Sequence, residues 1–161
     1  MSAAQGNITL ESALAVKDDM ILELSYYQKQ KEFFKLLSNH QQAIEDLVRF
    51  HLSLHEEVHC DISDCSSWIS GNFNVCIPVF VKSQIDETQT RVIIRIPLPY
   101  KLGETENVGN VEEKARCEAA TYIWIKNNCS SVPIPRLWGF GFTSGSCVSF
   151  FFFQPSPIII E

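Results

Sequence analysis

The hydrophobic positions in the first third of the chain recur with a helical period. Residues 18–37 are rich in helix-forming residues and carry enough apolar side chains for one buried side. Residues 41–54 follow the period more closely, with apolar residues at i, i+3, i+4 and i+8: Ile44, Leu47, Val48 and Leu52. The pattern predicts two amphipathic helices, and we interpret residues 18–59 as a helical extension that packs on the rest of the domain. Residues 1–17 lack such a pattern, and we expect them to be disordered.

From Cys60 onward the period changes to that of β-strands. Pro78 lies inside one apolar run, and because proline cannot donate a hydrogen bond to a ladder, we expect that strand at an edge or a bulge. The order of helices and strands predicts an α+β domain with an antiparallel sheet. Five strands are predicted, at residues 65–69, 75–81, 91–97, 137–142 and 147–153.

One further helix is predicted between the third and fourth strands, at residues 110–128. Asn110 can cap this helix, and the acidic residues Glu112 and Glu113 in its first turn suit the helix dipole. An apolar stripe with helical spacing is expected to face the core. It consists of Cys117, Ala120, Thr121, Trp124 and Ile125.

The bulk composition narrows the class of protein. The chain has 161 residues, enough for one domain with its own core, and 45% of them are hydrophobic and 20% charged. A formal net charge of −6 argues against nucleic acid as a partner and against a basic membrane-binding surface. No run reaches the length of a transmembrane helix and no secretory signal is present, so we expect a soluble, cytoplasmic protein without a membrane partner. In that setting the six cysteines are expected to be free thiols.

Two features suggest a site for a phosphate group. Residues 68–79 have the pattern of a hairpin, with apolar runs on either side of a tight polar turn at Gly71. Arg95 lies in an apolar strand, where an unpaired cation is costly, and Glu118 on the following helix is the partner that we expect for it. The alternatives are a hairpin that is only a turn, and an arginine that points to solvent from an edge strand.

Residues His55–His59 match the zinc-protease pattern H-E-x-x-H. In that pattern two histidines one helical turn apart bind a metal ion, and the glutamate acts as general base. No histidine follows His59 to supply a third ligand. We therefore interpret this segment as a solvated helix end, and a zinc metalloprotease is the alternative.

Four sequence blocks stand in a specific order and spacing. They are residues 68–79 (WISGNFNVCIPV), 91–100 (RVIIRIPLPY), 113–122 (EKARCEAATY) and 132–141 (VPIPRLWGFG). Together they resemble the N-terminal lobe of the aminoglycoside phosphotransferase-like family, in the protein-kinase-like superfamily, over about residues 60–145. The resemblance is closest to the branch common in filamentous fungi. It implies a kinase-like lobe at residues 60–153, a five-stranded antiparallel sheet with one packed helix, preceded by N-terminal helices.

The resemblance also implies a cofactor and the residues that bind it. The cofactor is ATP, and a loop formed by Gly71, Asn72, Phe73 and Asn74 would lie over its phosphates. Arg95 stands at the position of the strand-three lysine of kinases, and Glu118 at the position of that lysine's helix partner. An arginine grips phosphate and carboxylate through two bonds, so it is not equivalent to a lysine.

The groups that perform phosphoryl transfer are missing from the sequence. Kinase-like transfer uses a catalytic-loop aspartate, and an asparagine and a second aspartate that hold magnesium. No histidine follows His59 and no aspartate follows Asp86. We therefore expect a truncated protein that retains the ATP-phosphate-binding lobe without the catalytic lobe, has no catalytic residue, holds no magnesium, and ends in a non-family tail at residues 154–161. A full-length relative would phosphorylate a small hydroxylated acceptor.

A second class of function fits the same sequence. A non-catalytic interaction module would bind a protein partner through an exposed apolar face.

Overall fold

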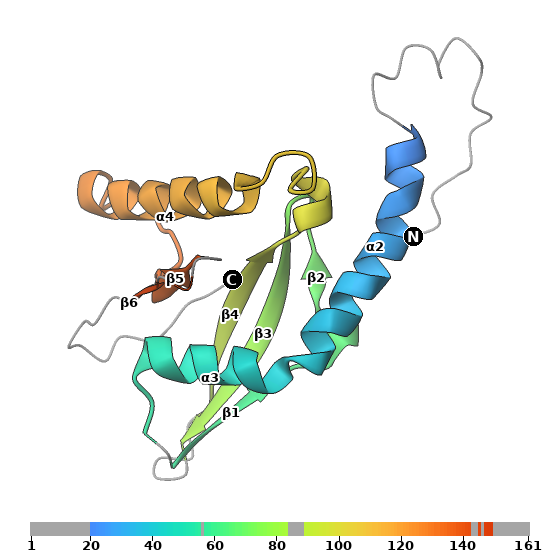
Figure 1. Ribbon diagram of the computed structural model, residues 1–161. Coiled ribbons are helices and arrows are strands. Elements are labelled where there is room, and N and C mark those ends of the chain that lie inside the picture. The colour runs from blue at the N-terminus through green and yellow to red at the C-terminus, as the bar shows by residue number, and fades with distance from the viewer. Residues whose placement is uncertain (1–19, 56, 84–88, 143–144, 146, 150–161) are drawn as a thin grey trace, which may run out of the picture.

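The computed structural model combines antiparallel strands with three long helices in the part of the chain that it describes, residues 20–55, 57–83, 89–142, 145 and 147–149. Helices α2 (Met20–Asn39) and α3 (Gln41–Leu52) precede the strands, and helix α4 (Asn110–Asn128) follows the main sheet (Figure 1). The predicted α+β class is confirmed. Within the described residues, no helix combines the length and the apolar character that crossing a membrane requires.

A four-stranded antiparallel sheet lies at the centre, with β3 as its middle strand. One side of β3 pairs with β4 from Asn74 to Lys82. The other side pairs with β2 near the start of β3 and with β1 near its end, and the short 3-10 helix η1 separates these two. The bounds are β1 (Val58–Ile62), η1 (Cys65–Ser67), β2 (Ile69–Ser70), β3 (Asn74–Ser83) and β4 (Gln89–Pro97).

The strands differ from the five-stranded sheet expected from the sequence. The predicted strand at residues 65–69 is η1 followed by β2, and β1 was not predicted. The fourth predicted strand is shorter, β5 (Gly139–Gly141), and the described part of the fifth is β6 (Cys147–Ser149); the two pair in a separate two-stranded sheet within the described residues. Residues 150–153 of the predicted fifth strand lie outside the described residues, as do residues 1–17 and 154–161.

Pro78 lies in the middle strand β3, so the expected edge strand is wrong, but an irregularity of the ladder, the other alternative for a proline, does occur beside it. β1 ends opposite Val79 and β2 begins opposite Cys76, so Pro78 faces the interruption between them. Its carbonyl accepts a hydrogen bond from Ser63 N at 2.9 Å on that side. Since the N–H and C=O groups of a strand residue point to the same side, the missing N–H also falls at the interruption. No ladder bond to β4 is lost.

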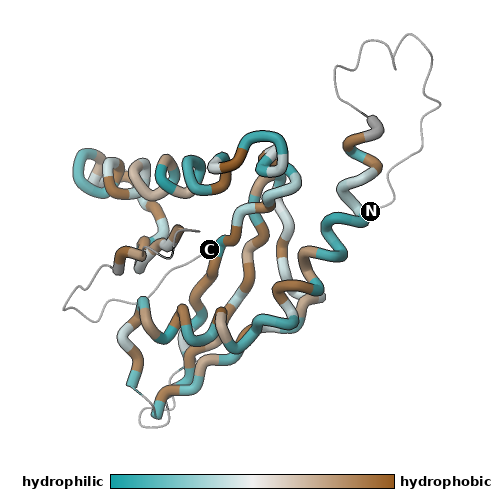
Figure 2. The backbone as a smooth tube through the Cα atoms, in the orientation of Figure 1, coloured by the Kyte–Doolittle hydropathy of each residue, from teal (hydrophilic) through white to brown (hydrophobic). Residues whose placement is uncertain are grey.

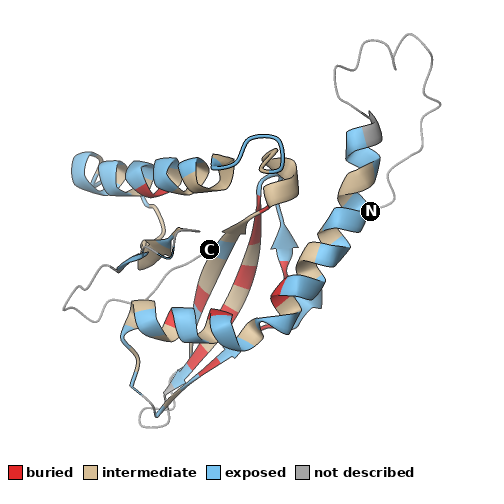
Figure 3. Ribbon diagram, viewed as in Figure 1, coloured by how far each residue is buried: buried red, intermediate tan, exposed pale blue. Residues whose placement is uncertain are grey.

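The core lies between the sheet and the helices α2 and α3 (Figures 1 and 3). Alternate residues of β3 are buried beneath these helices, and hydrophobic positions run along β3 and β4 in Figure 2. α2 and α3 contribute Leu37, Ile44 and Val48 to the same two clusters. The helices therefore share the core of the sheet. The buried residues of β3 are Val75, Ile77, Val79 and Val81.

Helix α4 has the predicted bounds but is rotated about its axis relative to the prediction. Four of the five residues of the expected core stripe are exposed: Cys117, Ala120, Thr121 and Trp124. The buried residue is Ala119. Asn110 is not the cap, because Gly109 holds that position and Asn110 donates its side-chain amide to Leu102 O.

The carboxylate of Glu104 caps the N-terminus of α4. One oxygen accepts a hydrogen bond from Gly109 N at 2.8 Å, and the other accepts one from Val111 N at 2.7 Å. These bonds lower the pKa of Glu104 and satisfy two backbone donors that the helix leaves unpaired.

Candidate functional site

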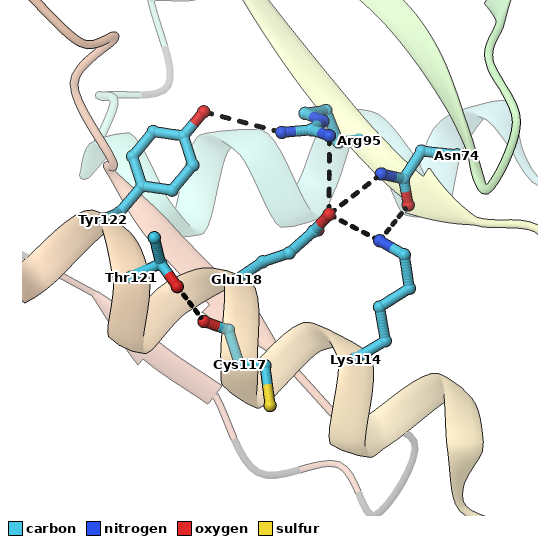
Figure 4. Close-up of polar contacts among 7 residues, drawn as sticks. All are labelled: Asn74, Arg95, Lys114, Cys117, Glu118, Thr121 and Tyr122. Atoms are coloured by element: carbon cyan, nitrogen blue, oxygen red, sulfur yellow. Dashed lines mark hydrogen bonds and ion pairs between the residues drawn. The ribbon is translucent and has the colours of Figure 1, made fainter.

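Four polar side chains meet where α4 passes the sheet (Figure 4). Asn74 begins β3, Arg95 lies near the end of β4, and Lys114 and Glu118 stand one turn apart on α4. Arg95 is opposite Cys76 in the ladder, on the face of the sheet away from the buried residues of β3. The structure thus brings Asn74, Arg95 and Glu118 together from three separate elements.

Donors from three residues reach one oxygen atom, Oε1 of Glu118. Lys114 Nζ lies 2.5 Å from it, Asn74 Nδ2 3.3 Å, and Arg95 Nη2 3.5 Å. Lys114 also donates to Oδ1 of Asn74 at 3.0 Å, and Nη1 of Arg95 reaches the hydroxyl of Tyr122 at 3.5 Å. Lys114 is therefore the nearest partner of Glu118, and Arg95 is held more loosely.

The cluster carries an excess of positive charge, since two cations face one carboxylate. The Lys114 side chain is 17% exposed, whereas those of Arg95 and Glu118 are 43% and 38% exposed. Burial by itself would raise the pKa of Glu118, but the Lys114 hydrogen bond, the charges of Arg95 and Lys114, and the Asn74 bond together hold it below its ordinary value. Glu118 is ionised at neutral pH, and one positive charge remains for an external anion.

The tip of the β2–β3 hairpin, residues 71–73, directly precedes Asn74 of the cluster in the sequence and presents backbone N–H donors. Gly71 N donates to Asn74 O at 2.8 Å, and Phe73 O accepts from Leu98 N at 2.8 Å, which fixes both ends of the tip. Asn72 and Phe73 are exposed, and within the described part of the chain their backbone N–H groups have no hydrogen-bond partner. Such open N–H groups are the kind of donor that phosphate oxygens accept from.

Lys114 is a member of the cluster that was not predicted from the sequence. A signal was present, because Lys114 stands four residues before Glu118, the spacing at which helical side chains form ion pairs. Arg116 and Glu112 form a pair of the same kind two residues away, but on another side of the helix and outside the cluster. Spacing alone did not indicate which pair faces the sheet.

The H-E-x-x-H segment is not the helix end that the sequence predicted. α3 ends at Leu52, and Val58 and His59 already belong to β1. Glu56 lies outside the described residues. His55 and His59 therefore do not stand one helical turn apart, and no group of three metal-ligating side chains gathers anywhere in the described ranges.

A groove elsewhere on the surface contains none of the cluster residues. It has a volume of about 370 Å³ and runs between α2 and the 3-10 helix η2 (Pro99–Lys101). Its lining combines the apolar side chains of Phe33, Leu36 and Tyr100 with the charged side chains of Lys29 and Glu32. The polar cluster, in contrast, brings two cations to one carboxylate.

Comparison of the chain with protein-family models, curated proteins and solved structures found no match in any of the three.

Proposed function

We propose that this chain is a kinase-like lobe that binds the phosphates of ATP and does not complete phosphoryl transfer on its own. The observation that carries the proposal is the convergence of Arg95, Asn74 and Glu118, with Asn74 directly following a hairpin tip that has open backbone N–H groups. An apolar strand that places its arginine against a helix glutamate is the arrangement that the sequence resemblance implies for a nucleotide site. The cytoplasm, where ATP is available, is the proposed location.

The residues fit a triphosphate through charge and donors. Arg95 would contact phosphate oxygens through its partly exposed guanidinium, and the N–H groups of Asn72 and Phe73 would cover the phosphates from the tip. When bound, ATP supplies a transferable phosphoryl group. The chain contains no aspartate after Asp86, so transfer would need carboxylates that this sequence does not supply in the kinase-like order.

The test is ATP binding by isothermal titration calorimetry at constant ionic strength. Arg95→Met is expected to weaken ATP binding by about 10- to 100-fold, because a charge-assisted hydrogen bond contributes about 1.5–3 kcal/mol. Arg116→Met is the matched control, since it removes the same charge from a residue that pairs with Glu112 outside the cluster. If Arg95→Met and Arg116→Met lost ATP affinity equally, Arg95 would contribute only through the overall charge of the protein. Magnesium-dependent ATP turnover that persists at constant specific activity through repurification would contradict the non-catalytic part of the proposal.

An interaction module is the second candidate function, and the rotation of α4 favours it. Cys117, Ala120, Thr121 and Trp124 form an apolar stripe on the exposed side of this helix, and Trp124 is 59% exposed. Exposed tryptophans are enriched among residues that dominate protein interfaces.

If α4 binds a protein partner, Trp124→Ser is expected to weaken that association at least about tenfold. Sedimentation velocity over a range of concentrations measures self-association, and co-purification measures a different partner. Leu24→Ser on α2 is the control, because Leu24 is 77% exposed and lies on another helix. If Trp124→Ser associated as strongly as the unmodified chain, α4 would not be the interface.

A further inference from the structure

The Glu118 carboxylate occupies the centre of what is otherwise an anion-binding arrangement. Its donors come from β3, β4 and α4 and converge on the single atom Oε1 (Figure 4). Proteins bind phosphate and carboxylate ligands through such convergent, charge-assisted donors. Here the anion that they surround belongs to the protein itself.

The donors are not bound equally firmly. Lys114 is largely buried and is fixed by two bonds, to Glu118 and to Oδ1 of Asn74. Arg95 makes two contacts of 3.5 Å, to Glu118 and to Tyr122, at the long limit for a hydrogen bond. Its guanidinium therefore loses little when it turns to another anion.

Charge favours an external dianion over the internal carboxylate. Glu118 offers one negative charge to two cations, and its side chain is 38% exposed, so a change of rotamer can carry it into water. Once Glu118 has moved away, Lys114 and Arg95 present two positive charges to the ligand. A terminal phosphate, which carries close to two negative charges at neutral pH, matches them better than a carboxylate or a monoanionic phosphodiester.

We propose that Glu118 is a built-in competitor for the anion site, and that a dianionic terminal phosphate displaces it and binds Lys114, Arg95 and Asn74. Lys114 and Asn74 are then ligand-binding residues, and Glu118 sets how much dianion is needed to occupy the site. The proposal rests on the proposed function only for the identity of the phosphate as part of a nucleotide. In kinase-like transfer the helix glutamate holds the cation in place for the nucleotide. The effect proposed here has the opposite sign.

The experiment titrates inorganic phosphate into the whole chain, with sodium chloride adjusted to keep the ionic strength constant. Binding is read from the Asn74 side-chain amide resonance in nitrogen–proton correlation spectra, because that amide donates to the atom being displaced. Glu118→Gln is expected to bind phosphate about fivefold more tightly or better than the unmodified chain. Lys114→Met, made in the Glu118→Gln background, is expected to cancel that gain. Acetate, a monoanion, is expected to show little binding to any variant.

Glu112→Gln is the matched control. Glu112 accepts from Arg116 across one helical turn, as Glu118 does from Lys114, but it lies outside the cluster. Its phosphate affinity is expected to match that of the unmodified chain. The backbone resonances of each variant verify that α4 remains folded.

The outcomes separate this inference from the proposed function. Tighter phosphate binding by Glu118→Gln supports the inference, even if the unmodified chain fails to bind ATP, which would overturn the nucleotide function alone. Weaker phosphate binding by Glu118→Gln, together with intact ATP binding by the unmodified chain, overturns the inference and leaves the proposed function standing. If neither the unmodified chain nor Glu118→Gln binds phosphate, the inference is also overturned.

Discussion

Ile77→Ala is expected to lower the free energy of unfolding by about 2–5 kcal/mol, the range for removing a fully buried aliphatic side chain. Ile77 is 0% exposed in the middle strand and belongs to the cluster that joins Leu37 of α2 and Ile44 of α3 to the sheet. The smaller side chain leaves a cavity that neighbours on three elements would have to close together. Urea unfolding followed by circular dichroism measures the loss.

Ile69→Ala is the control for this variant. Ile69 has the same side chain but is 66% exposed on β2, so its replacement is expected to change stability by no more than about 0.5 kcal/mol. If both variants lost similar stability, the buried layer between β3 and the helices α2 and α3 would not be the main core. The slopes of the two unfolding curves should agree, which shows that the unfolded states are comparable.

The sequence predicted the bounds of α4 but not the side that it buries. Its apolar stripe at Cys117, Ala120 and Trp124 has the correct helical spacing, and periodicity contains no further information about which side meets the sheet. In the structure Lys114 and Glu118 face Asn74 and Arg95 of the sheet, and Ala119 is the buried residue of the helix. The side of α4 toward the sheet therefore carries polar contacts that the hydrophobic pattern did not indicate.

β1 and the interrupted edge of β3 could not be placed from local sequence for a related reason. Val58, Cys60 and Ile62 do alternate in the manner of a strand, but the segment is short and follows an amphipathic helix with no glycine or proline between them. The strand exists because β3 offers an unpaired edge next to it, and this edge depends on residues about 20 positions later. Tertiary pairing, rather than local preference, selects the strand.

The sequence predicted one contact of the candidate site, the pairing of Arg95 with Glu118, and the two side chains lie 3.5 Å apart. The reason given for it was burial, but Arg95 lies on the face of the edge strand β4 away from the core and is 43% exposed, so the alternative of an arginine that faces solvent is partly met as well. The roles of Lys114 and Asn74 depend on how three elements are oriented in space. No pattern within a single element contains that information.

Gly139→Ala is expected to destabilise the attachment of the β5–β6 hairpin to α3 by about 1–3 kcal/mol, the cost of overpacking a close contact. A Cβ atom at Gly139 would lie 2.8 Å from Cγ and Cε1 of the His51 ring and closer still to Nδ1. Cγ joins the ring to its stem, so a small shift of the ring tip cannot relieve the overlap. The imidazole must leave its place against β5. Urea unfolding measures the loss, and amide exchange at Phe140 measures the detachment of the hairpin.

His51→Ala in the same chain provides the decisive control, because it removes the group that the new methyl would strike. The double variant His51→Ala/Gly139→Ala is expected to lose less stability than the sum of the two single variants.

Burial lowers the pKa of His51 from its ordinary value of 6.5, so as the pH falls the unfolded chain takes up a proton before the folded chain does. The stability of the unmodified chain should therefore decrease as the pH falls below 6.5. In Gly139→Ala, where the displaced ring is exposed to water, that decrease should be smaller. Additive losses and an unchanged pH dependence would mean that His51 and Gly139 are not in contact.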